Sequence, residues 1–209
     1  MRTISTAWAA AVWVLSLCGQ AGAVRPWPDT SSRIGVFADQ LPGSLTAAQR
    51  QFAATNLAGT QKQRASDLAA LRVYNTNFLC LHYQLAVGQG PELFIDGDAW
   101  VSDWTTVNAQ TNWFLLNAQT QRVYQTSWNW YLMDLRHTNG TPLTGWPQYW
   151  ITTCVARMKS TGSDAVFADS YTQDAYSFGA CNPTHPWLED TGLLQANWIP
   201  QLEAFGRAI

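Results

Sequence analysis

The stretch from Trp128 to Tyr171 constrains the fold more than any other part of this chain, because it has the pattern of strand, helix and strand. Its first apolar run ends on Asp134 and its second ends on Asp169. Between them lie apolar residues at helical spacing, followed by Gly162 as a helix stop. Two buried strands joined by a helix are typically parallel neighbours. The pattern therefore predicts that both aspartates lie at the same edge of one sheet.

That edge is where α/β folds carry their functional residues, since the loops after parallel strands are held by a rigid frame. A single aspartate at a strand end is usually explained by a salt bridge or a helix cap. Two of them on consecutive strands, with Arg136 close in sequence and aromatic residues around them, favour a functional site.

The same pattern of an apolar run followed by polar residues recurs along the chain. We expect strands beginning near residues 34, 52, 78, 128 and 164, and the second of these is the least well defined. The first ends on Asp39, and the third carries Tyr83 near its end. Helices are expected over residues 47–51, 60–74, 119–127 and 193–209 as well as after residue 145, and Pro200 lies near the middle of the last one.

This succession of β/α units predicts an α/β fold of the (β/α)8 class, the TIM barrel. A Rossmann sheet is disfavoured because no GxGxxG turn follows the first strand. A complete barrel takes about 250 residues and eight units, whereas the pattern supplies about five strands. We therefore expect residues 34–209 to form the N-terminal portion of a truncated TIM barrel.

The N-terminus has the features of a secretory signal peptide over residues 1–23. Arg2 precedes the apolar run 7–18, and Ala21-Gly22-Ala23 is a small-x-small cleavage site. An uncleaved anchor is the alternative, and a lipoprotein at Cys18 is disfavoured because Leu17 precedes it. The prediction is a secreted or periplasmic protein with a Pro-rich lead-in at 24–33 and no stable membrane span after cleavage.

Composition narrows the possible partners. The net charge is −2 without a basic patch, so nucleic acid is not expected as a partner. The three histidines lack metal-ligand spacing, which predicts no metal and no cofactor. Three cysteines follow the signal segment, of which Cys154 and Cys181 could pair while Cys80 is expected to be a buried thiol. The oligomeric state stays open.

Tryptophan is unusually frequent, with 12 residues in the chain. Most of them are expected in the core, because large aromatic side chains supply much buried area. Four lie in polar stretches where an exposed ring could stack on a sugar: Trp100, Trp104, Trp146 and Trp187.

Five motifs together resemble a known family. They are IGVFADQ, FAATNLAGTQK, FLCLHYQL, WYLMDLRH followed by a Trp-Pro-x-Tyr helix start, and GSDAVFADSY. In this order they are similar to the TIM-barrel glycoside-hydrolase-like family 15, which is unrelated to the glucoamylases. More loosely, the chain resembles the secreted polygalactosaminidase-type barrels. The resemblance begins at about Ile34 and implies catalytic carboxylates at strand ends, with Asp134 and Asp169 as the acidic pair.

Glycoside hydrolysis requires two carboxyl groups, one ionised and one protonated. We expect Asp134 to act as nucleophile or base, with Arg136 keeping a nearby carboxylate ionised, and Asp169 to act as acid or transition-state stabiliser. Asp39, Tyr83 and Tyr171 would hold sugar hydroxyls, and Trp146 would stack on a sugar ring. Two alternatives remain: a carbohydrate-binding barrel remnant without catalysis, and a metal-dependent deacetylase or phosphodiesterase. The absence of histidine beside the aspartates argues against the latter.

Overall fold

The protein is described by a computed structural model that covers residues 25–29, 31, 34–91, 103–117, 119–125, 129–135, 144–171 and 191–208. The signal segment, Arg136, Cys181, Trp100 and Trp187 lie outside the described residues, as do the predictions made for them.

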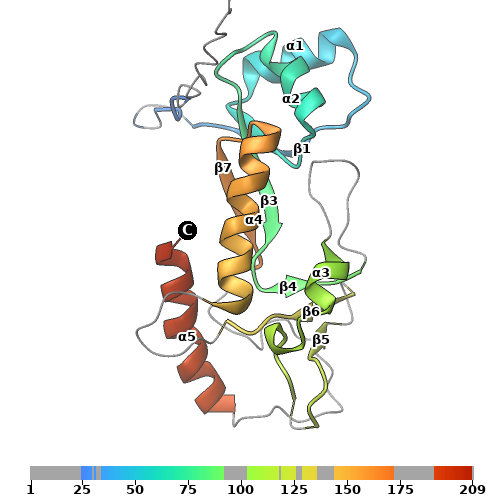
Figure 1. Cartoon of the computed structure of the whole chain (residues 1–209). Coiled ribbons are helices and arrows are strands. Elements are labelled where there is room, and N and C mark those ends of the chain that lie inside the picture. The colour runs from blue at the N-terminus through green and yellow to red at the C-terminus, as the bar shows by residue number, and fades with distance from the viewer. Residues whose placement is uncertain are drawn as a thin grey trace, which may run out of the picture.

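A four-stranded parallel sheet forms the centre of the fold (Figure 1). It contains β1 (Phe37–Gln40), β2 (Gly59–Gln61), β3 (Leu79–Leu85) and β7 (Ala165–Asp169), in the spatial order β1-β2-β3-β7. β3 and β7 pair over five residues, from Leu81 opposite Ala165 to Leu85 opposite Asp169. β1 and β7 are therefore the edge strands.

Two helices follow strands β1 and β2 of this sheet, and a third precedes β7. α1 (Ala47–Asn56) begins with a capping box between Thr46 and Gln49, in which each side chain bonds the backbone of the other. α2 (Ala65–Arg72) and α1 enclose a small apolar core with Phe78 and Cys80. α4 (Gly145–Thr161) packs against β3 and β7 and ends at Gly162, whose φ of 75° suits a glycine.

A second, antiparallel sheet lies beyond the carboxyl end of β3. It contains β4 (Gly88–Gln89), β6 (Trp130–Leu132) and β5 (Tyr124–Gln125), in the order β4-β6-β5. α3 (Trp104–Asn108) and a 3₁₀ turn (Thr111–Trp113) lie beside it. α5 (Thr191–Ala208) runs alongside α4 and contains Pro200.

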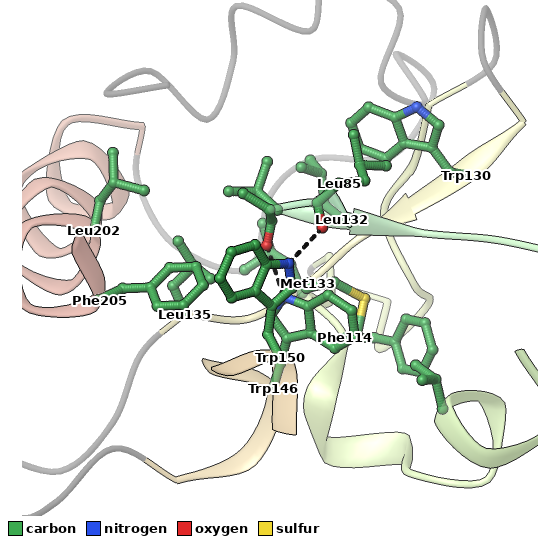
Figure 2. Packing of buried hydrophobic residues seen from close by; sticks show 14 of the residues in the cluster. Leu85, Phe114, Trp130, Leu132, Met133, Leu135, Trp146, Trp150, Leu202 and Phe205 are labelled. Atoms are coloured by element: carbon green, nitrogen blue, oxygen red, sulfur yellow. Dashed lines mark hydrogen bonds between the residues drawn. The ribbon is translucent and has the colours of Figure 1, made fainter. Parts of the chain in front are cut away.

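The larger core joins this sheet to α4 and α5. Figure 2 shows that the indoles of Trp146 and Trp150 point toward the end of β3, where they donate to the carbonyls of Ala86 (2.8 Å) and Leu85 (2.9 Å). Phe205 of α5 packs edge-on against Trp150, with ring centroids 5.1 Å apart. These buried donors are satisfied, so the tryptophans stabilise the junction between the two sheets.

The coarser fold prediction, a mixed α/β fold with a parallel sheet, is confirmed. The predicted pairing of the two aspartate-bearing strands is wrong, because β7 pairs with β3 while β6 pairs antiparallel with β4 and β5. The helix after β6 does return the chain to a parallel strand, but the neighbour of that strand comes from residues 79–85. The TIM barrel itself stays a prediction.

Two local predictions are also wrong. Residues 52–56 continue helix α1, and the second strand is β2 at Gly59–Gln61, so the helix expected over 60–74 begins only at Ala65. The segment 119–127 is not helical where it is described: it holds a turn and strand β5, and the preceding helix is α3. Both segments are short and weakly periodic, so contacts with the rest of the fold decide their conformation.

Candidate functional site

The carboxyl ends of β1 and β2 are joined by a polar contact. The Gln61 side-chain amide donates to Asp39 Oδ1, and Lys62 Nζ lies 3.2 Å from the same oxygen. The Asp39 side chain is nevertheless 71% exposed. Its carboxylate is therefore held in place by β2 while remaining open to a ligand.

The same row of side chains continues across β3 to β7. Lys62 Nζ lies 4.5 Å from the centre of the Tyr83 ring, and the Tyr83 hydroxyl donates to Asp169 Oδ2. The other Asp169 oxygen accepts the Ser170 N–H at 2.7 Å. The structure thus brings together three predicted site residues, Asp39, Tyr83 and Asp169, from three strands.

The Tyr83 hydroxyl stays protonated in this setting. Burial raises the pKa of Tyr83 well above its usual range, and the hydrogen bond to Asp169 and the negative charges of Asp169 and Asp39 raise it further. Tyr83 therefore acts as a hydrogen-bond donor, which orients the Asp169 carboxylate.

Two residues after these strand ends have a left-handed backbone. Lys62, which follows β2, has φ 58°, and Ser170, which follows β7, has φ 56°. Non-glycine residues adopt this region at a cost of the order of 1–3 kcal/mol, and such strain is concentrated at functional sites. The strain adds support for a functional site at this end of the sheet.

A hollow of about 270 Å³ opens beside this row. Phe37, Leu81 and Phe167 give it apolar walls, while Asp39 and Gln61 give it polar ones. Phe167 is 39% exposed and stacks on Tyr83 with ring centroids 6.2 Å apart. The arrangement of a flat apolar surface next to hydrogen-bonding groups suits a sugar ring.

Asp134 lies after β6 in the second sheet. Its N–H donates to the carbonyl of Trp113 at 2.8 Å. The preceding residue, Met133, donates to Val87, while the adjacent Ala86 donates to the carbonyl of Asp169. The chain positions of Asp134 and Asp169 are thus linked through the two residues Ala86 and Val87 and not by direct strand pairing.

The remaining predicted site residues differ in their surroundings. Trp146 was expected as a stacking surface, but it is 1% exposed at the start of α4, so that expectation is wrong. Trp104 is half-buried and stacks on Tyr131. Tyr171 is partly exposed, and its hydroxyl donates to the Leu202 carbonyl of α5.

A second polar cluster lies under α4, on the opposite face of β3. Arg157 donates to Gln84 (2.7 Å) and pairs with Asp103 (3.2 Å), which also accepts the Tyr149 hydroxyl. Burial and the hydrogen bond to Asp103 raise the pKa of Tyr149 to about 12. These groups bond mainly to one another, so the cluster connects β3, α3 and α4.

His82 is buried beside this cluster. Neither of its ring nitrogens has a hydrogen-bond partner among the residues that the structure describes. Burial and the charge of Arg157 lower the pKa of His82 to about 4. The imidazole is therefore neutral at pH 7.

The cysteines near these clusters are thiols. Cys80 is buried, as expected, and burial raises its pKa. Cys154 is also a buried free thiol, so the structure does not contain the disulfide considered for it. Burial raises the pKa of Cys154 to about 12.

Within the described ranges, no group of three or more His, Cys, Asp or Glu side chains is close enough to hold a metal ion. None of the helices in the part of the chain that the structure describes is long and apolar enough to cross a membrane.

Sequence reasoning missed Gln61, Lys62 and Phe167. Gln61 is the last residue of β2 and Lys62 follows it, but this strand was expected several residues earlier, so their place at a strand end was not recognised. Phe167 was treated as a core residue of an apolar run. The signal that could have found Gln61 and Lys62 is the sequence Gly-Thr-Gln-Lys, in which polar residues directly follow a glycine between two helices.

The sequence also matches a known protein family. The profile of a family described as hypothetical glycosyl hydrolase family 15 matches residues 72–208, which is well over half of the chain. The chain belongs to this family. The resemblance inferred from the five motifs is therefore confirmed, and membership in hypothetical glycosyl hydrolase family 15 indicates a carbohydrate-active function. A search of curated proteins gives no match.

Proposed function

We propose that this chain is a glycoside hydrolase that acts on a poly- or oligosaccharide at the carboxyl ends of β1, β2, β3 and β7. The observation that carries the proposal is the row from Asp39 through Lys62 and Tyr83 to Asp169. It places an oriented carboxylate beside an open hollow in a member of a glycosyl hydrolase family.

Asp169 and Asp134 are proposed as the catalytic pair. Both oxygens of Asp169 accept hydrogen bonds, from Tyr83 and from the Ser170 N–H, so this carboxylate is held in a fixed orientation. We therefore assign Asp169 the role of nucleophile, base or stabiliser and Asp134 that of proton donor, which reverses the order expected from sequence. The link through Ala86 and Val87 supports their proximity.

Export is part of the same proposal. Arg2, the apolar run 7–18 and the small residues before Val24 support a secreted or periplasmic location. N-terminal sequencing of the protein recovered from a secreting host should begin at Val24. Recovery of intact chains in the cell membrane would instead support an uncleaved anchor.

Substrates with different leaving groups distinguish the role proposed for Asp134 from the role proposed for Asp169. We would assay the purified protein on a panel of polysaccharides by reducing-end release and on 4-nitrophenyl glycosides by absorbance. Loss of a general acid costs roughly 10²–10⁴-fold on a glycan. A nitrophenolate leaves without a proton, so Asp134→Asn should spare it, whereas Asp169→Asn should impair both substrates.

The alternatives predict other results. A non-catalytic remnant, favoured by the placement of β6 outside the parallel sheet, would bind glycans with unchanged affinity in Asp134→Asn and hydrolyse none. A metal-dependent hydrolase would lose a bound ion in the same variant. Unchanged glycan turnover in both aspartate variants would remove the proposed pair.

A further inference from the structure

One residue that lines the hollow beside Asp39 has a hydrogen-bond acceptor without a partner. Gln61 is 8% exposed and lines this hollow, yet its Oε1 has no hydrogen-bond partner among the described residues. A buried polar atom without a partner costs free energy, so native proteins rarely leave one without a reason. An absent ligand with an O–H group is one such reason.

The orientation of the Gln61 amide is fixed by its neighbour. Its Nε2 faces Asp39 Oδ1, and a carboxylate at neutral pH can only accept. Exchanging the amide oxygen and nitrogen would place two acceptors against each other. Oε1 is therefore the amide atom that is left without a hydrogen-bond partner.

The other groups around Gln61 define the chemistry of the missing ligand. Asp39 offers a further exposed acceptor, and Lys62, bonded to Asp39, is a cation beside it. Phe37, Leu81 and Phe167 present apolar surface. A ligand with hydroxyl groups along one edge and C–H groups on its face matches this combination, and the Asp39–Lys62 pair offsets charge, which favours a neutral ligand.

The volume limits the size of the ligand. The hollow measures about 270 Å³, just below the roughly 300–1,000 Å³ of pockets for drug-sized molecules. A single ring fits this space, whereas a longer chain would extend out of it toward Asp169.

We propose that this hollow is a subsite for one neutral sugar ring and that Gln61 Oε1 determines specificity by accepting a hydrogen bond from a ring hydroxyl. The choice of a sugar rests on the proposed function. The subsite is separate from the catalytic pair, because neither Asp134 nor Asp169 lines the hollow.

The test combines deoxygenated ligands with a variant of Gln61. Methyl glycosides of glucose, galactose and mannose are titrated into the full chain, with binding followed by NMR. For the one that binds, each monodeoxy analogue is measured on the wild type and on Gln61→Met. One hydroxyl should contribute about 3- to 10-fold in Kd to the wild type, and the same deletion should cost Gln61→Met less than about 2-fold.

Gln63→Met is the matched control. Gln63 is also a buried amide two residues away, but it donates to the Leu41 carbonyl and does not line the hollow. This variant should show the wild-type dependence on the hydroxyl. If Gln61→Met does not fold, the deoxy series on the wild type still decides, since the inference requires one hydroxyl with at least about a 3-fold effect.

The inference is overturned if none of the three glycosides binds, if no single hydroxyl matters, or if Gln61→Met depends on the hydroxyl as the wild type does. Its failure is distinguishable from that of the proposed function. Glycan hydrolysis with an unaffected Gln61→Met would remove the subsite alone. Sugar binding through Gln61 with full turnover in both aspartate variants would remove the catalytic assignment alone.

Discussion

The carboxylates at the two ends of the parallel sheet have different surroundings. At the amino end, Asp164 pairs with Arg25 (3.0 Å) and Arg72 (2.7 Å) and accepts the Cys80 N–H (2.8 Å). Arg72 also donates to the carbonyls of Phe78 and Gly162. At the carboxyl end, Asp39 is largely exposed and Gln61 retains an unused acceptor. The carboxylate at the amino end is therefore buried between two arginines, whereas Asp39 at the carboxyl end is open to solvent.

The difference separates stability from function. The Asp164 side chain is 10% exposed and paired with two arginines, so its contribution is to the fold. The unpartnered Gln61 Oε1 and the left-handed backbone of Lys62 and Ser170 are costs that a fold carries only where another benefit offsets them. In barrel enzymes the same division holds between the two faces of the barrel.

Asp164→Ala should show the largest loss of stability. It leaves Arg72 and the Cys80 N–H without their partner in a setting where burial lowers the pKa of Arg72. Removing one member of a buried ion pair costs about 3–5 kcal/mol. Urea unfolding followed by tryptophan fluorescence measures the change in the free energy of unfolding. A loss below about 1 kcal/mol would mean that the contacts of Asp164 do not stabilise the fold.

Acid should destabilise the protein first through His82, which lies on the face of the sheet that α4 covers. The pKa of His82 is lowered to about 4 in the folded chain. Between pH 6.5 and 4 the unfolded chain therefore binds a proton that the folded chain does not bind. Stability from this group is present above pH 6.5 and is lost as the pH falls. The free energy of unfolding should drop by about 2 kcal/mol from pH 7 to pH 5. His82→Gln should lack this drop, and an equal drop in that variant would contradict the assignment.

Gly206→Ala tests whether Tyr171 packs against α5 or is part of the open carboxyl end of the sheet. A Cβ at residue 206 would lie 2.2 Å from the Tyr171 hydroxyl oxygen, which is too close for any contact. The clash outweighs the gain in helix propensity, and the net destabilisation should be about 1 kcal/mol. In the Tyr171→Phe background the nearest ring carbon is 3.1 Å away, so the loss should at least halve. Equal losses of stability in both backgrounds would show that the Tyr171 hydroxyl does not pack against residue 206 of α5.

Asp39→Asn should change stability least. The Asp39 side chain is exposed, and exposed pairs such as Asp39–Lys62 contribute about 0–1 kcal/mol. Thermal unfolding should shift little at low salt and less at 1 M salt, where the pair is screened. A loss of stability comparable with that of Asp164→Ala would mean that the carboxylates at both ends of the sheet stabilise the fold equally.

The sequence was informative where apolar runs end on polar residues. The ends at Asp39, Tyr83 and Asp169 were predicted from this pattern, and the structure groups them, because parallel strands bring their carboxyl ends to one edge. The long amphipathic helix that ends at Gly162 was recognised for a similar reason, since its periodicity is local.

Pairing between strands could not be read in the same way. The run that ends on Asp134 is as apolar as the run that ends on Asp169, yet it lies in an antiparallel sheet. Trp146 occurs in a polar stretch, but the carbonyl of Ala86 accepts its indole N–H inside the core. Both outcomes depend on contacts with residues distant in sequence, which composition and spacing do not encode.

The central claim is that the carboxyl end of the sheet is functional and the amino end structural. Its most direct test compares Asp169→Asn with Asp164→Asn, measuring glycan turnover and the urea midpoint of each. The account predicts that Asp169→Asn keeps a near-wild-type midpoint and loses roughly 100-fold or more in turnover. It predicts that Asp164→Asn loses stability but keeps turnover per folded molecule. Full turnover in Asp169→Asn, with the loss confined to Asp164→Asn, would contradict it.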